Sequence, residues 1–445
     1  MAVSIHLKRT LGLLLVGFLS LQIAHAGPRI ESWETSGGAK VMFVAAPDLP
    51  MVDVRVVFDA GSARDGELPG LAVLTNALLT DGAGSWNADQ LAERLEDKGI
   101  EIGAGARRDM AWASIRSLTD SAAYEVAMST LTAVLAEPRF GAADLERNRQ
   151  AMQVALRRGE QSPGTVAKKA FWKAVFGNHP YAIHSGGTRE SLAAITREDI
   201  QAYHKRYYVA KNATVAIVGA LDRQAAEALA ERLTGKLPSG EPAARLPEVG
   251  HLDGAALKDI AFPSSQSHIL MGQPGMHRGD PDYFILYVGN HILGGSGLVS
   301  QLSEEVREKR GLSYSVYSYF SPMRKDGPFI VGAQTQNAKV GEATEVMRAT
   351  VRRFIEQGPT EEELTAAKRN ITGGFPLRIA SNSNIVEYLA MLGFYDLPLD
   401  YLDAFVGKVE AVTREQIMDA FSRRVDPDRF VTVVVGNGKA SKQGG

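Results

Sequence analysis

The chain contains an internal duplication, and this feature constrains its fold more than any other. A Thr-Arg-Glu sequence, a helix pattern and a β-branched run that ends in glycine occur at Thr196–Gly219 and again at Thr413–Gly436. The threonines are 413 − 196 = 217 residues apart and the glycines 436 − 219 = 217 residues apart, so the two copies align without a gap. Threonine is a favoured helix N-cap, and a β-branched run bounded by glycine is typical of a strand. Because solenoid repeats have periods of about 20–50 residues, a repeat of this length predicts two homologous domains.

The segment between the copies and the patterns within them suggest the domain organisation. Leu237–Pro242 contains two prolines and a glycine, which is typical of a linker. We therefore assign residues 27–236 to a first domain, 237–263 to a linker and 264–440 to a second domain. Strand and helix patterns occur in runs without strict alternation, which predicts an α+β fold with helices packed on a mostly antiparallel sheet in each domain.

The N-terminus has the pattern of a secretory signal peptide. Lys8 and Arg9 precede an apolar run over residues 11–21, and Ala24–Ala26 supplies the small residues of a cleavage site. We therefore expect residues 1–26 to be removed and the mature chain to be periplasmic or secreted. An uncleaved membrane anchor is the alternative, but the apolar run is shorter than the roughly 20 residues that span a bilayer.

Composition argues against several classes of partner. The 49 basic and 51 acidic residues nearly balance and form no basic stripe, which argues against nucleic acid. No later segment is apolar enough to form a stable membrane anchor. The chain has no cysteine, so its exported form relies on buried apolar area instead of disulfides, which a chain of this length can supply.

The helix pattern at Gly70–Leu78 is where the chain resembles a known family. It is similar to the pitrilysin/insulinase family of zinc metallopeptidases, whose catalytic members carry H-x-x-E-H on this helix. In that motif two histidines on one helix face share a zinc ion and the glutamate acts as base. The corresponding positions here are Val73, Asn76 and Ala77, and the family's third ligand, a glutamate, corresponds to Val154. The resemblance implies a member without a metal site or cofactor of its own, because one amide does not hold zinc.

The chain resembles the family again at a helix-to-strand corner in the second half. A helix pattern over residues 298–310 ends before Gly311, and a strand pattern follows over residues 312–320. Arg307 and Tyr314, seven residues apart, match the family's arginine–tyrosine signature. The resemblance implies that these side chains reach toward a zinc-bearing half, hold the substrate backbone and donate hydrogen bonds to the carbonyl under attack. A fixed donor there stabilises the negative charge that develops on the oxygen.

A glycine-containing loop precedes this corner, and the resemblance to the family's non-catalytic subunits implies a role for it in substrate binding. The loop residues are Gly294, Gly295, Ser296 and Gly297. Simpler interpretations stay open. The loop could be a flexible lead-in to the helix, Arg307 could pair with Glu304 one turn earlier, and Tyr314 could pack on the helical layer.

Other residues of chemical interest do not form a second site in the sequence. His291 lies at about the second-half equivalent of Ala77 but has no partner at ligand spacing, and a lone histidine is usually structural. The His179–Tyr181 segment also matches the family and is interpreted as structural. No G-x-S-x-G motif occurs, so a serine nucleophile is not expected.

Three hypotheses for the function remain. The first is a non-catalytic subunit of a heterodimeric periplasmic zinc peptidase, in which a homologous partner carries H-x-x-E-H and the zinc. This chain, not catalytic alone, then presents Arg307 and Tyr314 to a peptide or unfolded polypeptide, with its two domains facing each other across a cleft. The second is a structural scaffold without a proteolytic role, and the third is a peptide-binding homodimer. The retained arginine and tyrosine favour the first, because a scaffold needs neither.

Overall fold

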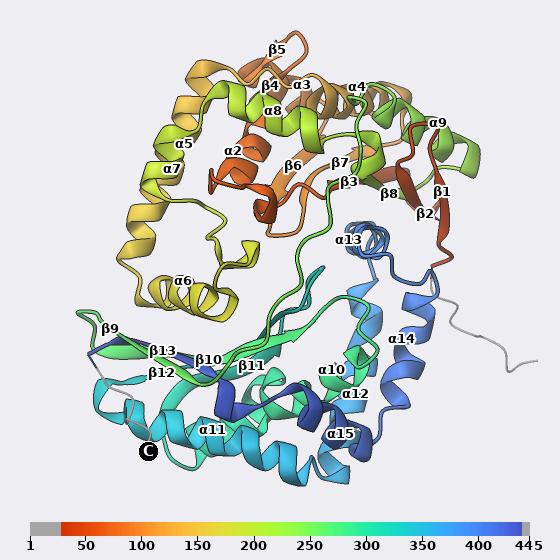
Figure 1. Ribbon diagram of the computed structural model, residues 1–445. Helices are drawn as coiled ribbons and strands as arrows, with labels where there is room; N and C mark the ends of the chain where they lie inside the picture. Colours follow the sequence, from red (N-terminus) through yellow and green to blue (C-terminus); the bar gives the residue numbers. More distant parts are fainter. Residues whose placement is uncertain (1–27, 438–445) are drawn as a thin grey trace, which may run out of the picture.

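Two halves face each other in the structure, and each half contains one large sheet (Figure 1). The computed structural model describes residues 28–437, so the predicted signal peptide lies outside the described residues. Helices cover the outer face of each sheet, and an extended segment crosses from the first half to the second. Within residues 28–437, no helix combines the length and the apolar character needed to cross a membrane.

The first sheet has six strands, in the spatial order β1-β2-β8-β3-β7-β6. The β2–β8 pair is parallel and the other pairs are antiparallel. The strands are β1 (Glu31–Glu34), β2 (Lys40–Ala45), β3 (Met51–Phe58), β6 (Glu101–Ala106), β7 (Ala111–Leu118) and β8 (Ala213–Gly219). A separate two-stranded hairpin comprises β4 (Gly82–Ala83) and β5 (Trp86–Asn87).

The second sheet has five strands, in the order β11-β12-β10-β13-β9, with β9 and β13 parallel and the rest antiparallel. The strands are β9 (Ala256–Ala261), β10 (Gln266–Met276), β11 (Ser313–Phe320), β12 (Gly327–Gln336) and β13 (Val431–Gly436). This order repeats β6-β7-β3-β8-β2 of the first sheet, including its one parallel pair. Even the register agrees, because Gly219 lies opposite Ala45 and Gly436 lies opposite Ala261. The predicted α+β fold of two homologous halves is confirmed.

The predicted linker over residues 237–263 is wrong at its C-terminal end. Strand β9 lies inside that range and belongs to the second sheet. It is an edge strand with mostly exposed residues, so its sequence lacks the apolar alternation that marks a half-buried strand. The remainder is not a free linker either, because Leu246 is buried among residues of both halves.

The outer helices follow the same duplication. Thr196 forms a capping box at the start of α8 (Arg197–Tyr207), and Thr413 forms one at the start of α15 (Arg414–Arg424), as the repeated sequence predicts. In the first half these helices are α2 (Leu71–Ala77), α3 (Ala88–Glu96), α4 (Ser121–Ala136), α5 (Ala142–Glu160), α7 (Arg189–Ala194), α8 (Arg197–Tyr207) and α9 (Arg223–Thr234). In the second half they are α10 (Tyr283–Asn290), α11 (Val340–Gln357), α12 (Glu361–Arg378), α14 (Tyr401–Glu410) and α15 (Arg414–Arg424).

Two further helices are exchanged between the halves. Helix α6 (Pro163–Phe176) comes from the first half but packs on β10 and β13 of the second sheet, and α13 (Asn382–Phe394) packs on β3 and β8 of the first (Figure 1). Both contacts are close: a Cβ on Gly272 of β10 would lie 3.1 Å from the Phe171 ring, and one on Gly393 of α13 would lie 2.5 Å from Thr214. Each half therefore covers the inner face of the other's sheet.

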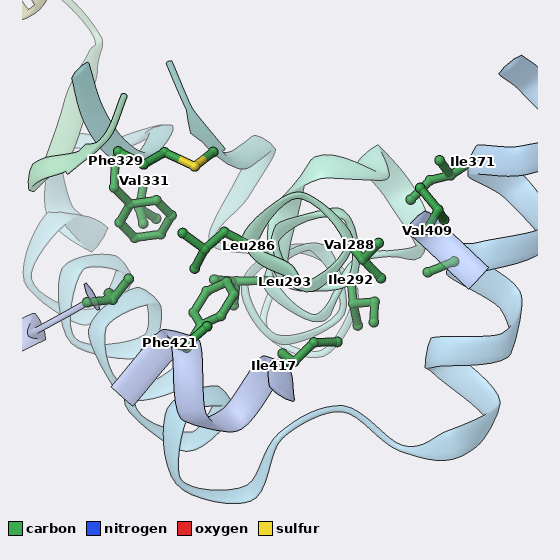
Figure 2. Packing of buried hydrophobic residues seen from close by; sticks show 14 of the residues in the cluster. Leu286, Val288, Ile292, Leu293, Phe329, Val331, Ile371, Val409, Ile417 and Phe421 are labelled. Carbon is green, nitrogen blue, oxygen red and sulfur yellow. The ribbon is translucent and has the colours of Figure 1, made fainter. Parts of the chain in front are cut away.

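The second half has a continuous apolar core between its sheet and its outer helices (Figure 2). Leu286 and Leu293 lie between Phe329 of β12 and Phe421 of α15. Gly289 allows α10 and α15 to approach closely, since a Cβ there would lie 2.5 Å from the Phe421 ring. This packing fixes α10 and hence the start of the segment that leads to Arg307 and Tyr314.

Candidate functional site

Helix α2 is where the family's zinc motif would lie, but its side chains are engaged in packing and hydrogen bonds within the fold. Asn76, at the position of the catalytic glutamate, is only 1% exposed, and its Nδ2 donates to the Trp112 carbonyl at 3.1 Å and to the Tyr208 hydroxyl oxygen at 3.2 Å. These bonds tie α2 to β7 and α8. Val73 and Ala77, at the histidine positions, are half-buried apolar residues. The side chains of α2 therefore serve the fold and offer no metal ligand.

The third ligand position gives the same result. Val154 is a half-buried residue of α5, a helix that contacts α2. The four positions that correspond to the family's zinc motif and third ligand thus lie on two neighbouring helices. Three of these positions hold apolar residues, and the fourth holds an amide that already makes hydrogen bonds. No group on this pair of helices at these positions can coordinate zinc.

A buried carboxyl stabilises the start of α2. Asp65 accepts hydrogen bonds from the Gly70 nitrogen at 2.7 Å and the Ala72 nitrogen at 2.8 Å. Burial raises the pKa of Asp65 to about 7, against the lowering effect of these two bonds. The sequence did not single out this residue, although an aspartate shortly before a helix is an expected capping residue.

Within residues 28–437, one other group has metal-ligand chemistry, comprising His277, Asp280 and Asp326 in the second half. His277 Nδ1 lies 2.9 Å from an Asp326 oxygen, and the Asp280 carboxylate is bound by the Arg424 guanidinium. A guanidinium on one of the three ligands opposes a second cation at the same place. The arrangement is accounted for by ion pairs.

The predicted glycine loop is part of an irregular segment. His291–Gly295 forms a π-helix (η5), Gly297–Val299 a 3₁₀ turn (η6) and Ser303–Glu308 a second π-helix (η7). The bonds from Ser296 nitrogen to His291 oxygen and from Lys309 nitrogen to Glu304 oxygen span five residues, as π-helical bonds do. The regular helix predicted over residues 298–310 is therefore wrong, because periodicity cannot distinguish these backbones over so short a stretch.

Gly294 and Gly297 of the loop are required by the structure for different reasons. A Cβ on Gly294 would lie 2.5 Å from the Ser318 backbone nitrogen, so Gly294 allows η5 to approach β11. Gly297 has φ +66° and open space around it. The residues that follow, Leu298 and Val299, are 63% and 86% exposed. The loop thus presents apolar side chains to solvent, which a mere lead-in to a helix does not require.

Arg307 is half-buried on η7, and its Nε lies 3.2 Å from a Glu308 oxygen. It does not pair with Glu304, which instead binds Lys309 at 2.9 Å. The second alternative for this corner, the packing of Tyr314 on the helical layer, is excluded by the side chain's exposure, 86%.

A β-bulge sets the position of Tyr314. Ser313 pairs with Thr335 and Ser315 with Gln334, so Tyr314 is the extra residue between them. The Ser313 hydroxyl holds the bulge through contacts of 2.7 Å with the carbonyls of Ser315 and Gln334. Among the described residues the Tyr314 hydroxyl has no hydrogen-bond partner, whereas bulges commonly redirect a side chain next to a functional site.

A large cavity lies where the two halves meet, with a volume of about 950 Å³. It is lined by the β6–β7 turn, the β11–β12 turn and helix α13. Neither Arg307 nor Tyr314 lines it. Tyr319, which does, is five residues from Tyr314 along β11, or roughly 17 Å at 3.3 Å per residue. Arg307 and Tyr314 therefore do not face this cavity between the halves.

A buried polar network joins the halves beside the cavity. Asp109, 3% exposed, accepts hydrogen bonds from Tyr181 Oη at 2.6 Å, Tyr395 Oη at 2.9 Å and the Arg324 nitrogen at 2.8 Å. Burial and the adjacent Asp109 carboxylate raise the pKa of both tyrosines. Tyr181 thus has a structural role, as the sequence analysis predicted for the His179–Tyr181 segment. Its hydrogen-bond partners could not be predicted, because they are distant from it in the sequence.

Comparison with known proteins identifies the family. Residues 40–189 match the family described as Insulinase (Peptidase family M16), and residues 194–371 match Peptidase M16 inactive domain. The chain therefore belongs to the M16 peptidase family. With the zinc-ligand positions replaced, it is a non-catalytic member of that family.

Particular relatives span nearly the whole chain. A solved structure of a peptidase M16 inactive domain from Pseudomonas fluorescens is 39% identical with a TM-score of 0.89, and the match covers 93% of this chain and 99% of that chain. An uncharacterised zinc protease of Mycobacterium leprae is 26% identical over 407 residues, 90% of each protein. The non-peptidase homolog YmxG of Helicobacter pylori is also 26% identical, over 400 residues, 88% of this chain and 91% of that protein. Because proteins named a zinc protease and a non-peptidase are equally similar to this chain, overall identity does not separate the two classes.

Proposed function

We propose that this chain is the non-catalytic subunit of a heterodimeric zinc peptidase of the periplasm. In this proposal it binds the substrate peptide and stabilises the carbonyl under attack at the active site of a homologous partner. The observation that carries the proposal is Tyr314. A large aromatic residue that is 86% exposed, displayed on a β-bulge with an unbonded hydroxyl, has no evident role in the fold of this chain.

The chemistry divides between the two proteins. The partner's H-x-x-E-H helix would hold zinc, which activates water and polarises the carbonyl. The Tyr314 hydroxyl of this chain donates a hydrogen bond to the oxygen as its negative charge develops, and the Arg307 guanidinium holds neighbouring substrate carbonyls. The exposed Leu298 and Val299 of the glycine loop add apolar contact to the same peptide. The location of the complex follows from the predicted signal peptide over residues 1–26.

Reconstitution tests the proposal. The chain is purified alone and together with a homologue that carries H-x-x-E-H, and zinc content and peptide hydrolysis are measured for each protein and for the pair. We expect neither stoichiometric zinc nor hydrolysis from this chain alone, and hydrolysis by the pair that exceeds that of the homologue alone. Chelator-sensitive hydrolysis by the isolated chain would contradict the proposal, and so would a homologue whose activity is unchanged by this chain. The latter result favours the scaffold hypothesis.

A further inference from the structure

The cavity between the halves has an unusual charge for this protein. Five arginines line it, Arg55, Arg107, Arg108, Arg278 and Arg378, and only two carboxylates, Asp109 and Glu387. The formal charge of the lining is therefore 5 − 2 = +3, whereas the whole chain has a net charge of −2. The excess of positive charge is a local property and not the background of a basic protein.

The two carboxylates leave most of these arginines without an ion pair. Asp109 is occupied by the two tyrosine hydroxyls and the Arg324 nitrogen described above. Glu387 pairs with Arg55 Nη2 at 2.9 Å and is largely exposed. Among the described residues, Arg107, Arg278 and Arg378 have no ion pair, and each contacts aromatic groups instead.

Two of the guanidinium groups also have unused hydrogen-bonding capacity. The Nε atoms of Arg55 and Arg278 are buried and have no hydrogen-bond partner in the structure. A buried donor without a partner is unfavourable, by about 1–3 kcal/mol for a typical group. Because these two Nε atoms are buried, an anion in the cavity would supply opposite charge to the arginines and would not reach the Nε atoms themselves.

The shape and walls of the cavity favour a polypeptide over a compact anion. Its volume of about 950 Å³ lies at the upper end of the range of about 300–1,000 Å³ for ligand pockets. The arginines come from β3, the β6–β7 turn, the segment after β10 and the end of α12, so they do not converge from one loop. Aromatic residues lie between them, among them Trp112, Tyr319 and Tyr388. Leu377 at the rim is 74% exposed, so the cavity opens to solvent.

We propose that this cavity binds an acidic segment of an extended polypeptide, with Asp or Glu carboxylates on the arginines and apolar side chains on the aromatic walls. The proposal rests on the proposed function in one respect, since it names the class of polypeptide that the complex handles. The cavity belongs to this chain alone. Its binding is therefore measurable without a zinc-bearing partner.

The test uses fluorescein-labelled peptides of equal length with the full mature chain, measured by fluorescence anisotropy. One peptide alternates Glu with Leu, the second replaces each Glu by Gln and the third by Lys. We expect the Glu peptide to bind about tenfold or more tightly than the Gln peptide, with an affinity that falls as salt is raised, and the Lys peptide to bind weakest. Equal binding of the Glu and Gln peptides would overturn the proposal.

Matched variants locate the binding. Arg107→Gln combined with Arg378→Gln should weaken the Glu peptide about tenfold and leave the Gln peptide unchanged. Both arginines are exposed, so folding should be retained, as thermal unfolding would check. Arg369→Gln is the control, because Arg369 is exposed on the same helix nine residues earlier, on roughly the opposite face. An equal effect of the control, or competition by inorganic phosphate or an oligonucleotide at concentrations below those of the Glu peptide, would contradict an acidic-peptide site.

If the Glu peptide fails to bind this chain while the reconstituted pair hydrolyses peptides, this inference fails and the proposed function stands. If the Glu peptide binds as expected but no reconstituted pair hydrolyses peptides, the proposed function fails and this inference stands.

Discussion

The two halves share strand order and register but differ in the segment that follows the central strand, β3 in the first half and β10 in the second. In the first half Asp65 caps a short regular helix, α2, whose side chains are packed and bonded. In the second half α10 continues into two π-helices, an exposed glycine loop and a bulge. Irregular backbone and exposed apolar side chains reduce stability. Their presence in one half, beside a regular counterpart in the other, supports the proposal that the second half binds the substrate.

Asn76 in the first half and Asn290 in the second have similar hydrogen bonds. Near the end of α10, Asn290 donates from Nδ2 to the Ser318 carbonyl at 3.0 Å and accepts from the Ser318 hydroxyl at 2.7 Å. Near the end of α2, Asn76 similarly ties its helix to β7. Asn76 occupies the position that the catalytic glutamate has in zinc-binding members of the family. Its amide links a helix to the sheet in the same way as the Asn290 amide in the second half.

The largest expected effect comes from restoring the family residue in the first half. Asn76→Glu places a carboxyl beside the Trp112 carbonyl with no cation, so the free energy of unfolding should fall by about 3–5 kcal/mol. Denaturant unfolding at neutral pH measures this change. Ala77→His, at a half-buried position, is the control and should cost much less. An Asn76→Glu protein with unchanged stability would show that the buried hydrogen bonds of Asn76 do not hold α2 in place.

The second effect concerns catalysis by the reconstituted pair. Tyr314→Phe should lower kcat about 10²-fold with assembly and zinc content unchanged, because one transition-state donor is worth about 2.7–4 kcal/mol. Arg307→Ala should raise KM as well. Tyr317→Phe, on the same strand but half-buried, is the matched control and should retain full turnover. Unchanged turnover of the Tyr314 variant in a verified active pair would refute its role.

The third effect tests the equivalence of the two asparagines. Asn76→Ala and Asn290→Ala should each lower the free energy of unfolding by about 1–3 kcal/mol, since each leaves a buried group without its partner. Urea denaturation of both variants gives the comparison. A large cost at one position and none at the other would break the parallel between the halves.

The last effect is a pH dependence that arises in the first half and changes stability gradually, pH unit by pH unit. The folded-state pKa of Asp65 is about 7, above its ordinary value of 3.8, so between these values the folded protein holds a proton that the unfolded chain has released. The stability contributed by this group therefore falls as pH rises through that window, by at most about 1.4 kcal/mol per pH unit, and is constant above it.

The half-buried His184 and the buried His204 act in the opposite direction. Burial lowers the pKa of His184 and of His204 to about 4, so their contribution to stability is lost as pH falls below about 6.5. The measurement is therefore the difference between the native chain and Asp65→Asn across pH 4 to 7, in which the histidine effects cancel. Identical pH profiles of the two proteins would show that Asp65 titrates normally.

Much of the fold was predictable because it depends on local patterns. The duplicated threonine caps and β-branched strands at Thr196–Gly219 and Thr413–Gly436 gave the two homologous halves directly. Strand β9 was missed, because an exposed edge strand needs no apolar alternation. The π-helices were missed because a shift from four-residue to five-residue hydrogen bonds leaves the apolar spacing nearly the same.

The site was predictable only in part. The loss of zinc ligands at Val73, Ala77 and Val154 follows from residue type alone. The exposure of Tyr314 depends on a bulge, which pairing with β12 creates and the sequence of β11 does not specify. The arginine-lined cavity and the Asp109 network unite residues more than 200 positions apart, so no local pattern could predict them.

The exchange of α6 and α13 has a consequence for the origin of the chain. Each half leaves the inner face of its own sheet bare and covers that of the other, so neither half is a complete folding unit. This is the arrangement of a domain-swapped homodimer whose two copies have been joined end to end. Fusion replaces a concentration-dependent association by an intramolecular one. In a fused chain the two copies can also differ in sequence, as they do here at α2 and at the segment after α10.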